Sequence, residues 1–214
     1  MGKSQKRKNI IKKINKKIVE FKISEPQHEF LTSTALSTGF VAVLGSGKSM
    51  IGSLKVLLFK IKYPKIKAAY YLPTYPLIKD IAFKNFANEL TKFKIDFSLN
   101  QQDKKFLTPY GDIIMRSMDN PNYIVGYETG YAVIDEIDVM PTDKAWSSYK
   151  QILARNRASM KGGNSVDMVS TPEGFGFMYE FFVKNSSPNK KLIQASTTDN
   201  PFLPADYIAN LMAD

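Results

Sequence analysis

A glycine-rich turn between an apolar run and a helical pattern restricts the fold of this chain more than any other feature. The stretch "GFVAVLGSGKSMIG" covers residues 39–52. Residues 39–44 are apolar and β-branched enough to predict a buried strand, and residues 49–62 have the periodicity of a helix. A strand that passes through glycines directly into a helix predicts a phosphate-binding loop in an α/β sheet.

The chemistry of this loop follows from its residue types. Glycines adopt the positive φ angles that let backbone N–H groups wrap a phosphate, and a helix start adds its positive dipole end. We expect Lys48 to reach the β- and γ-phosphates of ATP and Ser49 to hold Mg²⁺. Ala42 stands where the pattern G-x-x-x-x-G-K-[ST] has its first glycine. The residues predicted to contact the nucleotide here are Gly45, Ser46, Gly47, Lys48 and Ser49.

The remaining chain alternates strand and helix patterns, and 43% of its 214 residues are hydrophobic, which suits one domain with a real core. Such alternation predicts a mostly parallel central sheet flanked by helices on both faces, with ligands at the carboxyl ends of the strands. The predicted class is therefore an α/β P-loop NTPase of the ASCE type. Further strands are predicted at 66–73, 112–117, 131–136, 165–172 and 191–197, and further helices at 76–93 and 145–159.

An apolar run that ends in two acids forms the second predicted part of the site. In "YAVIDEID", residues 131–138, a buried strand carries Asp135 and Glu136 at its end. This is the Walker B pattern. Asp135 is expected to bind the Mg²⁺ that Ser49 also contacts, and Glu136 to polarise the attacking water as general base. An acid directly after the metal acid favours hydrolysis over binding alone.

Two weaker motifs flank these. In "EPQHEFL", residues 25–31, the amide of Gln27 can donate to and accept from an adenine edge at the same time. The alternative is a residue at a helix start. In "VSTPEGFG", residues 169–176, the hydroxyls of Ser170 and Thr171 are placed to sense the γ-phosphate, or else they form a polar turn.

Charge is concentrated at the amino end. Nine of the 30 basic residues lie in residues 1–22 with one acid, which gives that segment +8 of the net +10. The spacing of Ile11, Ile14 and Ile18 predicts a basic amphipathic helix. Such an arm suits DNA phosphates or an acidic partner, with a solvated terminus as the alternative. The absence of cysteine excludes disulfides and favours a reducing compartment, and no apolar run reaches membrane-helix length.

The order of these motifs, together with "STTDNPFLP" at residues 196–204, resembles the ATPase domain of the large terminase subunit of tailed bacteriophages. The resemblance covers roughly residues 24–214. It implies an ATPase that packages double-stranded DNA into a capsid, with ATP and Mg²⁺ as cofactors. By resemblance Gln27 contacts adenine, Lys48 and Ser49 form the Walker A pair, and Ser170 and Thr171 belong to the coupling motif.

The resemblance also implies partners and a setting. These are double-stranded DNA, a portal protein, a small terminase subunit and other copies of the chain in a ring, in the host cytoplasm and without a membrane. The expected division is a basic arm at 1–22 and an ATPase domain at 23–214. Members of the family continue into a nuclease domain whose acids have no counterpart in this sequence. The loop departs from the family at Ala42 and at Leu44, where an arginine or aromatic residue is common.

Arginine is scarce in this sequence, although the γ-phosphate needs extra positive charge during transfer. Arg116 is predicted at a strand end near the site, and Arg155 and Arg157 on the helix after the acidic strand. Any of the three is a candidate arginine finger, in the same chain or toward a neighbouring subunit. Two other functions compete with the packaging ATPase. One is the first lobe of a superfamily 2 helicase-like ATPase, and the other is a nucleotide-binding module without turnover.

Overall fold

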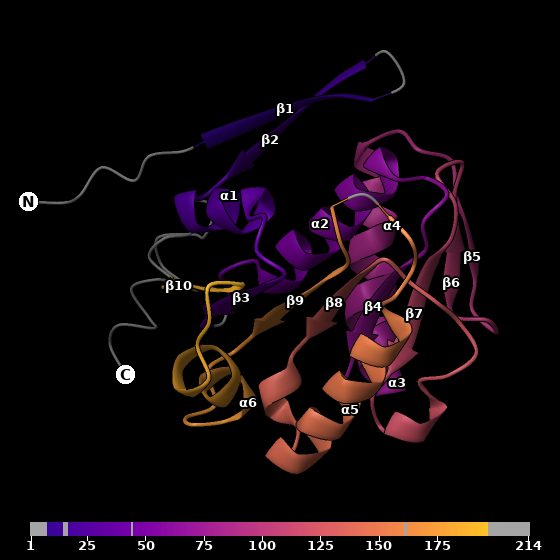
Figure 1. The fold of residues 1–214 in the computed structure, drawn as a ribbon. Coiled ribbons are helices and arrows are strands. Elements are labelled where there is room, and N and C mark those ends of the chain that lie inside the picture. Colours follow the sequence, from indigo (N-terminus) through magenta and orange to yellow (C-terminus); the bar gives the residue numbers. More distant parts are fainter. Residues whose placement is uncertain (1–7, 15–16, 44, 161, 197–214) are drawn as a thin grey trace, which may run out of the picture.

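The computed structural model describes residues 8–14, 17–43, 45–160 and 162–196. Within them, eight strands form one sheet in the order β10-β3-β9-β8-β4-β7-β6-β5 (Figure 1). Every pair from β10 to β7 is parallel, and β6 and β5 add an antiparallel edge. The predicted mostly parallel sheet is confirmed. Its strands are β3 (Ser37–Ala42), β4 (Ala68–Leu72), β5 (Ser98–Asn100), β6 (Lys105–Leu107), β7 (Ile113–Ser117), β8 (Tyr131–Asp135), β9 (Ser165–Ser170) and β10 (Lys190–Ala195).

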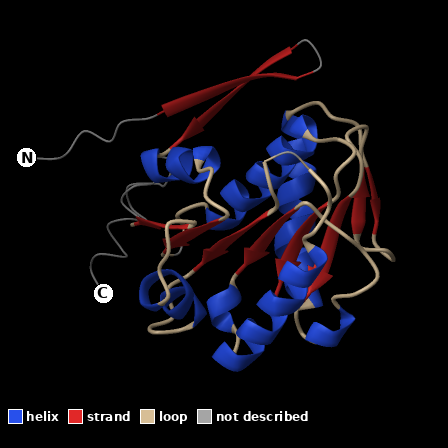
Figure 2. Cartoon of the chain, in the orientation of Figure 1, coloured by secondary structure: helices blue, strands red, loops and turns tan. Residues whose placement is uncertain are grey.

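Helices cover both faces of this sheet (Figure 2). The principal ones are α1 (Glu25–Thr32), α2 (Lys48–Lys62), α4 (Phe83–Lys92) and α5 (Thr142–Arg155). Two short helices, α3 (Tyr75–Leu77) and α6 (Phe177–Tyr179), continue into π-helical turns at Ile78–Ala82 and Glu180–Lys184. Single 3₁₀ turns lie at Pro121–Tyr123 and Ile137–Val139.

The two faces bury separate apolar clusters because side chains alternate along each strand. In β4, Tyr70 joins the cluster beneath α2 and α4, while Tyr71 joins the cluster beneath α5 and α6. The strands that are buried on both sides read as continuous apolar runs, which is why the sequence reveals them. The helices on both faces hold the carboxyl ends of β3, β9 and β8 together at one edge of the sheet.

The basic arm is a β-hairpin in its described part, so the predicted amphipathic helix is wrong. Strands β1 (Lys8–Ile14) and β2 (Lys17–Ile23) pair antiparallel with each other, with Ile11 opposite Glu20. The isoleucines and valine of the arm are β-branched, and such side chains lose more freedom in a helix than in a strand. The hairpin forms its own two-stranded sheet and does not join the central one.

Other boundaries also differ from the sequence prediction. The helix expected at 145–159 is α5, which begins at Thr142 and ends at Arg155, so Arg157 lies beyond it. The edge strands β5 and β6 were not predicted, since three residues are too few for a periodicity. No helix in the described ranges is long and apolar enough to cross a bilayer.

Candidate nucleotide site

The glycine-rich loop has the predicted backbone. Gly45 and Gly47 have φ angles of 77° and 78°, a conformation that side chains with a Cβ rarely adopt. Gly47 caps α2, whose first residue is Lys48, so the loop leads into the positive end of a 15-residue helix. Ala42 is buried at the end of β3 in regular pairing with Ala195. The backbone of this position therefore does not require a glycine.

Strand order gathers the motifs at one edge. Strand β9 lies between β3, which leads into the loop, and β8, which carries the acids. All three are parallel, so their carboxyl ends meet at the same edge. Ser170 therefore lies between the loop and Asp135. The sequence predicted each motif, and the sheet order shows that they come together.

Lys48 points into this junction. Its side chain is buried, its ammonium donates to the carbonyl oxygen of Val43 at 3.3 Å, and it lies 3.9 Å from the nearer oxygen of Glu136. Burial lowers the pKa of Lys48, and the carboxylates of Glu136 and Asp135 oppose that shift. A partly desolvated cation beside a glycine-rich loop is suited to phosphate oxygens.

Glu136 is held in a strained backbone conformation. Its φ is 57°, a left-handed conformation that is uncommon outside glycine and that Lys94 and Lys104 also adopt. Its N–H donates to the carbonyl of Val169 at 2.8 Å. Its carboxylate accepts from the N–H of Thr171 at 3.0 Å and from the Thr171 hydroxyl at 3.3 Å. The expected general base and the expected coupling motif are thus in direct contact.

Asp135 and Ser46 carry buried oxygens that lack protein partners among the described residues. Asp135 Oδ2 accepts from the Tyr70 phenol at 2.7 Å. Asp135 Oδ1 and Ser46 Oγ make no hydrogen bond of ordinary geometry with the described residues. Burial raises the pKa of Asp135 to about 7, an effect that the Tyr70 phenol and the nearby Ser49 hydroxyl reduce. Since unpaired buried oxygens are costly, these atoms fit a site completed by Mg²⁺ and phosphate.

A metal ion here would depend on few protein ligands. No group of three or more acidic or histidine side chains that could hold a metal occurs within the described ranges. Ser49 and Asp135 are consequently the residues that fit the predicted Mg²⁺, and the rest of its coordination would come from phosphate oxygens and water, as is usual for this ion.

Gln27 takes the alternative role considered for it, that of a residue at a helix start, where it forms a capping box with Ser24. It is buried in α1, its Nε2 donates to the carbonyl of Ser46 at 2.9 Å, and its Oε1 accepts from the N–H of Ser24 at 3.0 Å. Both ends of the amide are therefore engaged within the protein. In this structure Gln27 ties the start of α1 to the phosphate loop, and its predicted adenine contact stays a prediction.

The three described arginines lie away from the loop. Arg116 is in β7, three strands from β9, where its guanidinium donates to the carbonyls of Asp103 and Met115 and stacks on Tyr127. Its guanidinium is therefore engaged three strands from β9, and its place as a finger stays a prediction. Arg155 and Arg157 lie at the opposite edge, because the N–H of Thr129, just before β8, donates to the carbonyl of Arg155. None is a finger within the same chain in this geometry.

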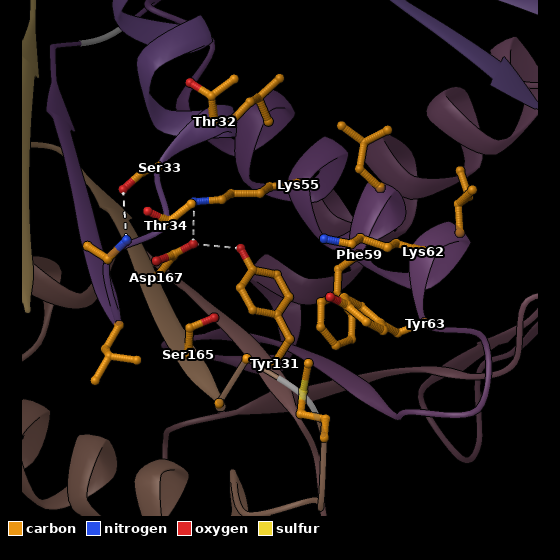
Figure 3. Close-up of a pocket in the computed structure, with 18 of the residues that line it drawn as sticks. Thr32, Ser33, Thr34, Lys55, Phe59, Lys62, Tyr63, Tyr131, Ser165 and Asp167 are labelled. Atoms are coloured by element: carbon orange, nitrogen blue, oxygen red, sulfur yellow. Dashed lines mark hydrogen bonds and ion pairs between the residues drawn. The ribbon is translucent and has the colours of Figure 1, made fainter.

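A cavity of about 820 Å³ lies at that opposite edge, between α1, α2 and the starts of β8 and β9 (Figure 3). Its polar centre is Asp167, which accepts from Tyr131 at 2.7 Å and from the N–H of Thr38 at 2.8 Å, and which pairs with Lys55 at 2.5 Å. Both oxygens of Asp167 are satisfied by the protein. We interpret this cluster as structural and separate from the nucleotide site.

Sequence reasoning missed Tyr70 and Asp138. Tyr70 lies within a predicted strand, where an apolar pattern gives no sign that its hydroxyl reaches Asp135 from the neighbouring strand. Asp138 accepts from the N–H of Met178 at 2.8 Å, and its own N–H donates to Ser170 at 3.2 Å. The sequence contains Asp138 as the last acid of "DEID", but only the fold shows that it links the acidic turn to α6.

Comparison with known proteins gives a consistent result. The family model described as the N-terminal part of the T4-like terminase large subunit matches residues 40–214. No significant match was found among curated proteins.

Solved structures resemble the chain at low sequence identity. The large terminase of a thermophilic bacteriophage is 14% identical with a TM-score of 0.74, over 89% of this chain and 50% of that one. The ATPase domain of the large terminase of Thermus phage P74-26 is 18% identical with a TM-score of 0.66, over 82% and 81%. The genome packaging motor assembly of bacteriophage Phi-29 is 14% identical with a TM-score of 0.54, over 78% and 52%. The chain thus spans about half the length of the first of these proteins.

Proposed function

The chain belongs to the family of T4-like terminase large subunits, of which it matches the N-terminal domain, and from this premise we propose that it is a Mg²⁺-dependent ATPase that drives double-stranded DNA into a procapsid. The observation that carries the proposal is the junction of Lys48, Glu136 and Thr171 at the edge where β3, β9 and β8 end. These contacts support the proposed roles of the three residues in a nucleotide-binding loop, as general base and in a coupling motif.

The chain's own residues divide the chemistry among them. The loop N–H groups and Lys48 bind and orient the phosphates, and their charge complements the negative charge that develops on the γ-phosphoryl group. Glu136 accepts the proton of the attacking water once its carboxylate turns from Thr171 toward that water. Ser49 and Asp135 would hold Mg²⁺, which would supply positive charge next to the phosphates.

Thr171 connects this chemistry to motion. In the described structure it occupies both oxygens of Glu136. Release of Glu136 on nucleotide binding would free Thr171 and the turn after β9. We infer that this release of Thr171 by Glu136 is the first step by which nucleotide binding changes the surface of the domain.

Known structures support nucleotide binding in this fold. The large terminase of the same thermophilic bacteriophage has been solved in complex with ADP and with ATP-gamma-S. The Phi-29 structure is a packaging motor assembly. We therefore propose ATP as the nucleotide, and DNA, a portal protein, a small terminase subunit and further copies of this chain in a ring as partners, working in the host cytoplasm.

The ring also supplies what the chain lacks. Because Arg116, Arg155 and Arg157 do not reach the loop, we propose that one of them serves the site of a neighbouring subunit. Arg157 is exposed, while Arg116 is engaged by backbone carbonyls. The family match favours this packaging role over a helicase-like lobe, and turnover separates it from a module that only binds nucleotide.

Glu136→Gln tests the proposed reaction. The amide keeps the size of the side chain but cannot take a proton, so turnover should fall on the order of 10²-fold or more. Binding of ATP should persist, because Lys48, Ser49 and Asp135 are unchanged. Steady-state phosphate release and equilibrium nucleotide binding measure the two quantities on the same preparations.

Glu29→Gln is the matched control for this experiment. It removes a carboxylate of the same kind from a surface pair with Lys191 at 3.0 Å, away from the loop. Its rate should equal that of the parent chain. Hydrolysis by the Glu136→Gln chain at near the parent rate would show that Glu136 is not the general base.

A further inference from the structure

A tyrosine from the neighbouring strand holds the metal acid of the proposed ATPase. Asp135 is the last residue of β8, it is fully buried, and one of its oxygens accepts from the Tyr70 phenol at 2.7 Å. Tyr70 lies in β4, opposite Val133 of β8. Its side chain therefore reaches diagonally to the residue two positions further along β8, on the same face of the sheet.

Packing fixes this phenol. Tyr70 is 1% exposed, and its ring meets that of Phe86 edge-on at 5.3 Å. Its oxygen lies 3.4 Å from the carbonyl of Ser49 in the first turn of α2. The helix comes this close because residue 52 is glycine, since a Cβ there would lie 3.3 Å from the phenol oxygen. The hydroxyl thus sits between the helix that carries Ser49 and the strand that carries Asp135.

A phenol has one proton to donate. Asp135 at 2.7 Å is a much better acceptor for it than the carbonyl of Ser49 at 3.4 Å. That bond sets the rotation of the carboxylate, because it fixes Oδ2. The other oxygen, Oδ1, is then left buried and without a hydrogen bond of ordinary geometry to the described residues. It is the oxygen available to a cation at Ser49.

The same chain contains a second tyrosine–aspartate pair, Tyr131 and Asp167, in which both carboxylate oxygens are bonded. A buried acid in this fold is therefore not always left with an unbonded oxygen. Tyr131 donates to Asp167 at the same 2.7 Å, and Lys55 pairs with that carboxylate as well (Figure 3). The N–H of Thr38 donates to its other oxygen. Asp167 is complete without a ligand. Within the described ranges, Asp135 has the phenol on one oxygen and no such bond on the other.

We propose that Tyr70 is a positioning residue for the metal site, which orients Asp135 so that Oδ1 meets the cation shared with Ser49. The inference rests on the proposed function, because it assumes that Asp135 is the metal acid. Residues that orient a metal ligand in this way typically change metal affinity by about 10–100-fold when they are removed.

The test compares Tyr70→Phe with Tyr131→Phe. Each change deletes one buried hydroxyl that donates at 2.7 Å to a buried carboxylate, so both should lower the melting temperature. Binding of Mn²⁺ in the presence of ADP is read by electron paramagnetic resonance, and ADP affinity is measured with and without Mg²⁺. These readouts do not require turnover.

Tyr70→Phe should weaken Mn²⁺ binding about tenfold or more while ADP affinity without metal stays at the parent value. Tyr131→Phe should leave Mn²⁺ binding unchanged. Equal Mn²⁺ affinity in the Tyr70→Phe and parent chains would overturn the proposal, as would an equal loss in both variants. Gly52→Ala is a second route. Its methyl group would lie 3.3 Å from the phenol oxygen and from Val133 and 3.4 Å from Val169, so it presses on the phenol without deleting it. Alanine also favours the helix, so a smaller loss in the same direction is expected.

The outcome separates this inference from the proposed function. A parent chain that binds metal with ADP but does not hydrolyse ATP would defeat the proposed reaction, and the Tyr70 comparison would still be decided by Mn²⁺ binding. A parent chain in which metal leaves ADP binding unchanged would overturn Asp135 as the metal acid, and the role of Tyr70 with it.

Discussion

At the scale of single residues, the sequence can identify a side chain of the site and still miss the contacts that it makes. Glu136 was predicted from its place after Asp135, and its φ of 57° adds a conformational sign that the sequence does not contain. Gln27 was predicted as an adenine contact from the chemistry of its amide. In the structure the same two groups serve Ser24 and Ser46.

Gln27→Glu distinguishes the two roles. The glutamate can still accept from the N–H of Ser24, but it places an oxygen where Nε2 donated to the carbonyl of Ser46. Loss of a buried donor costs about 1–3 kcal/mol, so a loop held by Gln27 should bind ADP about tenfold more weakly. Because the loop contacts phosphates, GDP affinity should fall by the same factor.

Titration of both nucleotides against the variant and the parent measures this. His28→Ala is the control, since its side chain lines the cavity at the opposite edge of the sheet. A loss confined to ADP, with GDP binding unchanged, would instead show that Gln27 reads the adenine base.

At the scale of elements, the sequence predicts those that bury continuous apolar surface and misses those that do not. The strands at β3, β4 and β8 and the helix α2 were found because their patterns are long and regular. The basic arm was misread because isoleucines at helical spacing were weighed above their β-branched character. Asp135 and Glu136 were found from a local motif, whereas the contact with Tyr70 depends on strand order, which no local pattern contains.

The carboxyl end of α2 depends on a buried charge and should respond to pH. Lys60 is 1% exposed and donates to the carbonyls of Pro64 and Ile66 at 3.0 and 2.6 Å. Burial lowers its pKa from the usual 10.5 to about 8, an effect that Asp112 partly opposes. Below about pH 8 both folded and unfolded chains carry this proton, so the full cost of burying the charge is present.

Between about pH 8 and 10.5 the folded chain releases that proton and the unfolded chain keeps it, so the contribution of Lys60 to stability rises with pH. Relative to Lys60→Met, the free energy of unfolding of the parent should increase on the order of 2 kcal/mol between about pH 7.5 and 9.5. Urea unfolding at several pH values measures the difference. Lys62→Met, an exposed lysine in the same turn, should run parallel to the parent. A parallel Lys60→Met curve would contradict the prediction.

At the scale of the whole molecule, charge and catalysis are separated. The arm holds +8 of the net charge of +10, and the residues proposed to be catalytic lie after it in a nearly neutral domain. The hairpin β1–β2 pairs only with itself in the described structure. Its carboxyl end is anchored, because Phe21 packs on Phe93 with ring centres 4.6 Å apart and Ile23 is buried. A deletion that spares this anchor should leave the domain folded.

Deletion of residues 1–19 therefore tests what the arm binds. It removes eight of the nine basic residues of the arm and retains Phe21 and Ile23. If the arm contacts DNA, each phosphate contact contributes about −0.9 to the slope of log affinity against log salt, and about four to six contacts are reasonable for eight charges. The deletion should flatten the slope by that amount and leave basal ATP hydrolysis at the parent rate.

A variant that changes only charge distinguishes the contribution of the basic side chains to DNA binding from that of the arm's backbone. A full-length chain with Lys12, Lys13, Lys16 and Lys17 changed to glutamine should give an intermediate slope, because it keeps the backbone and loses half of the charge that the deletion removes. DNA binding at three salt concentrations decides the matter. Equal slopes in all three chains would show that the arm does not contact DNA, and its charge would then be explained by an acidic protein partner, for which a portal protein is the first candidate to test.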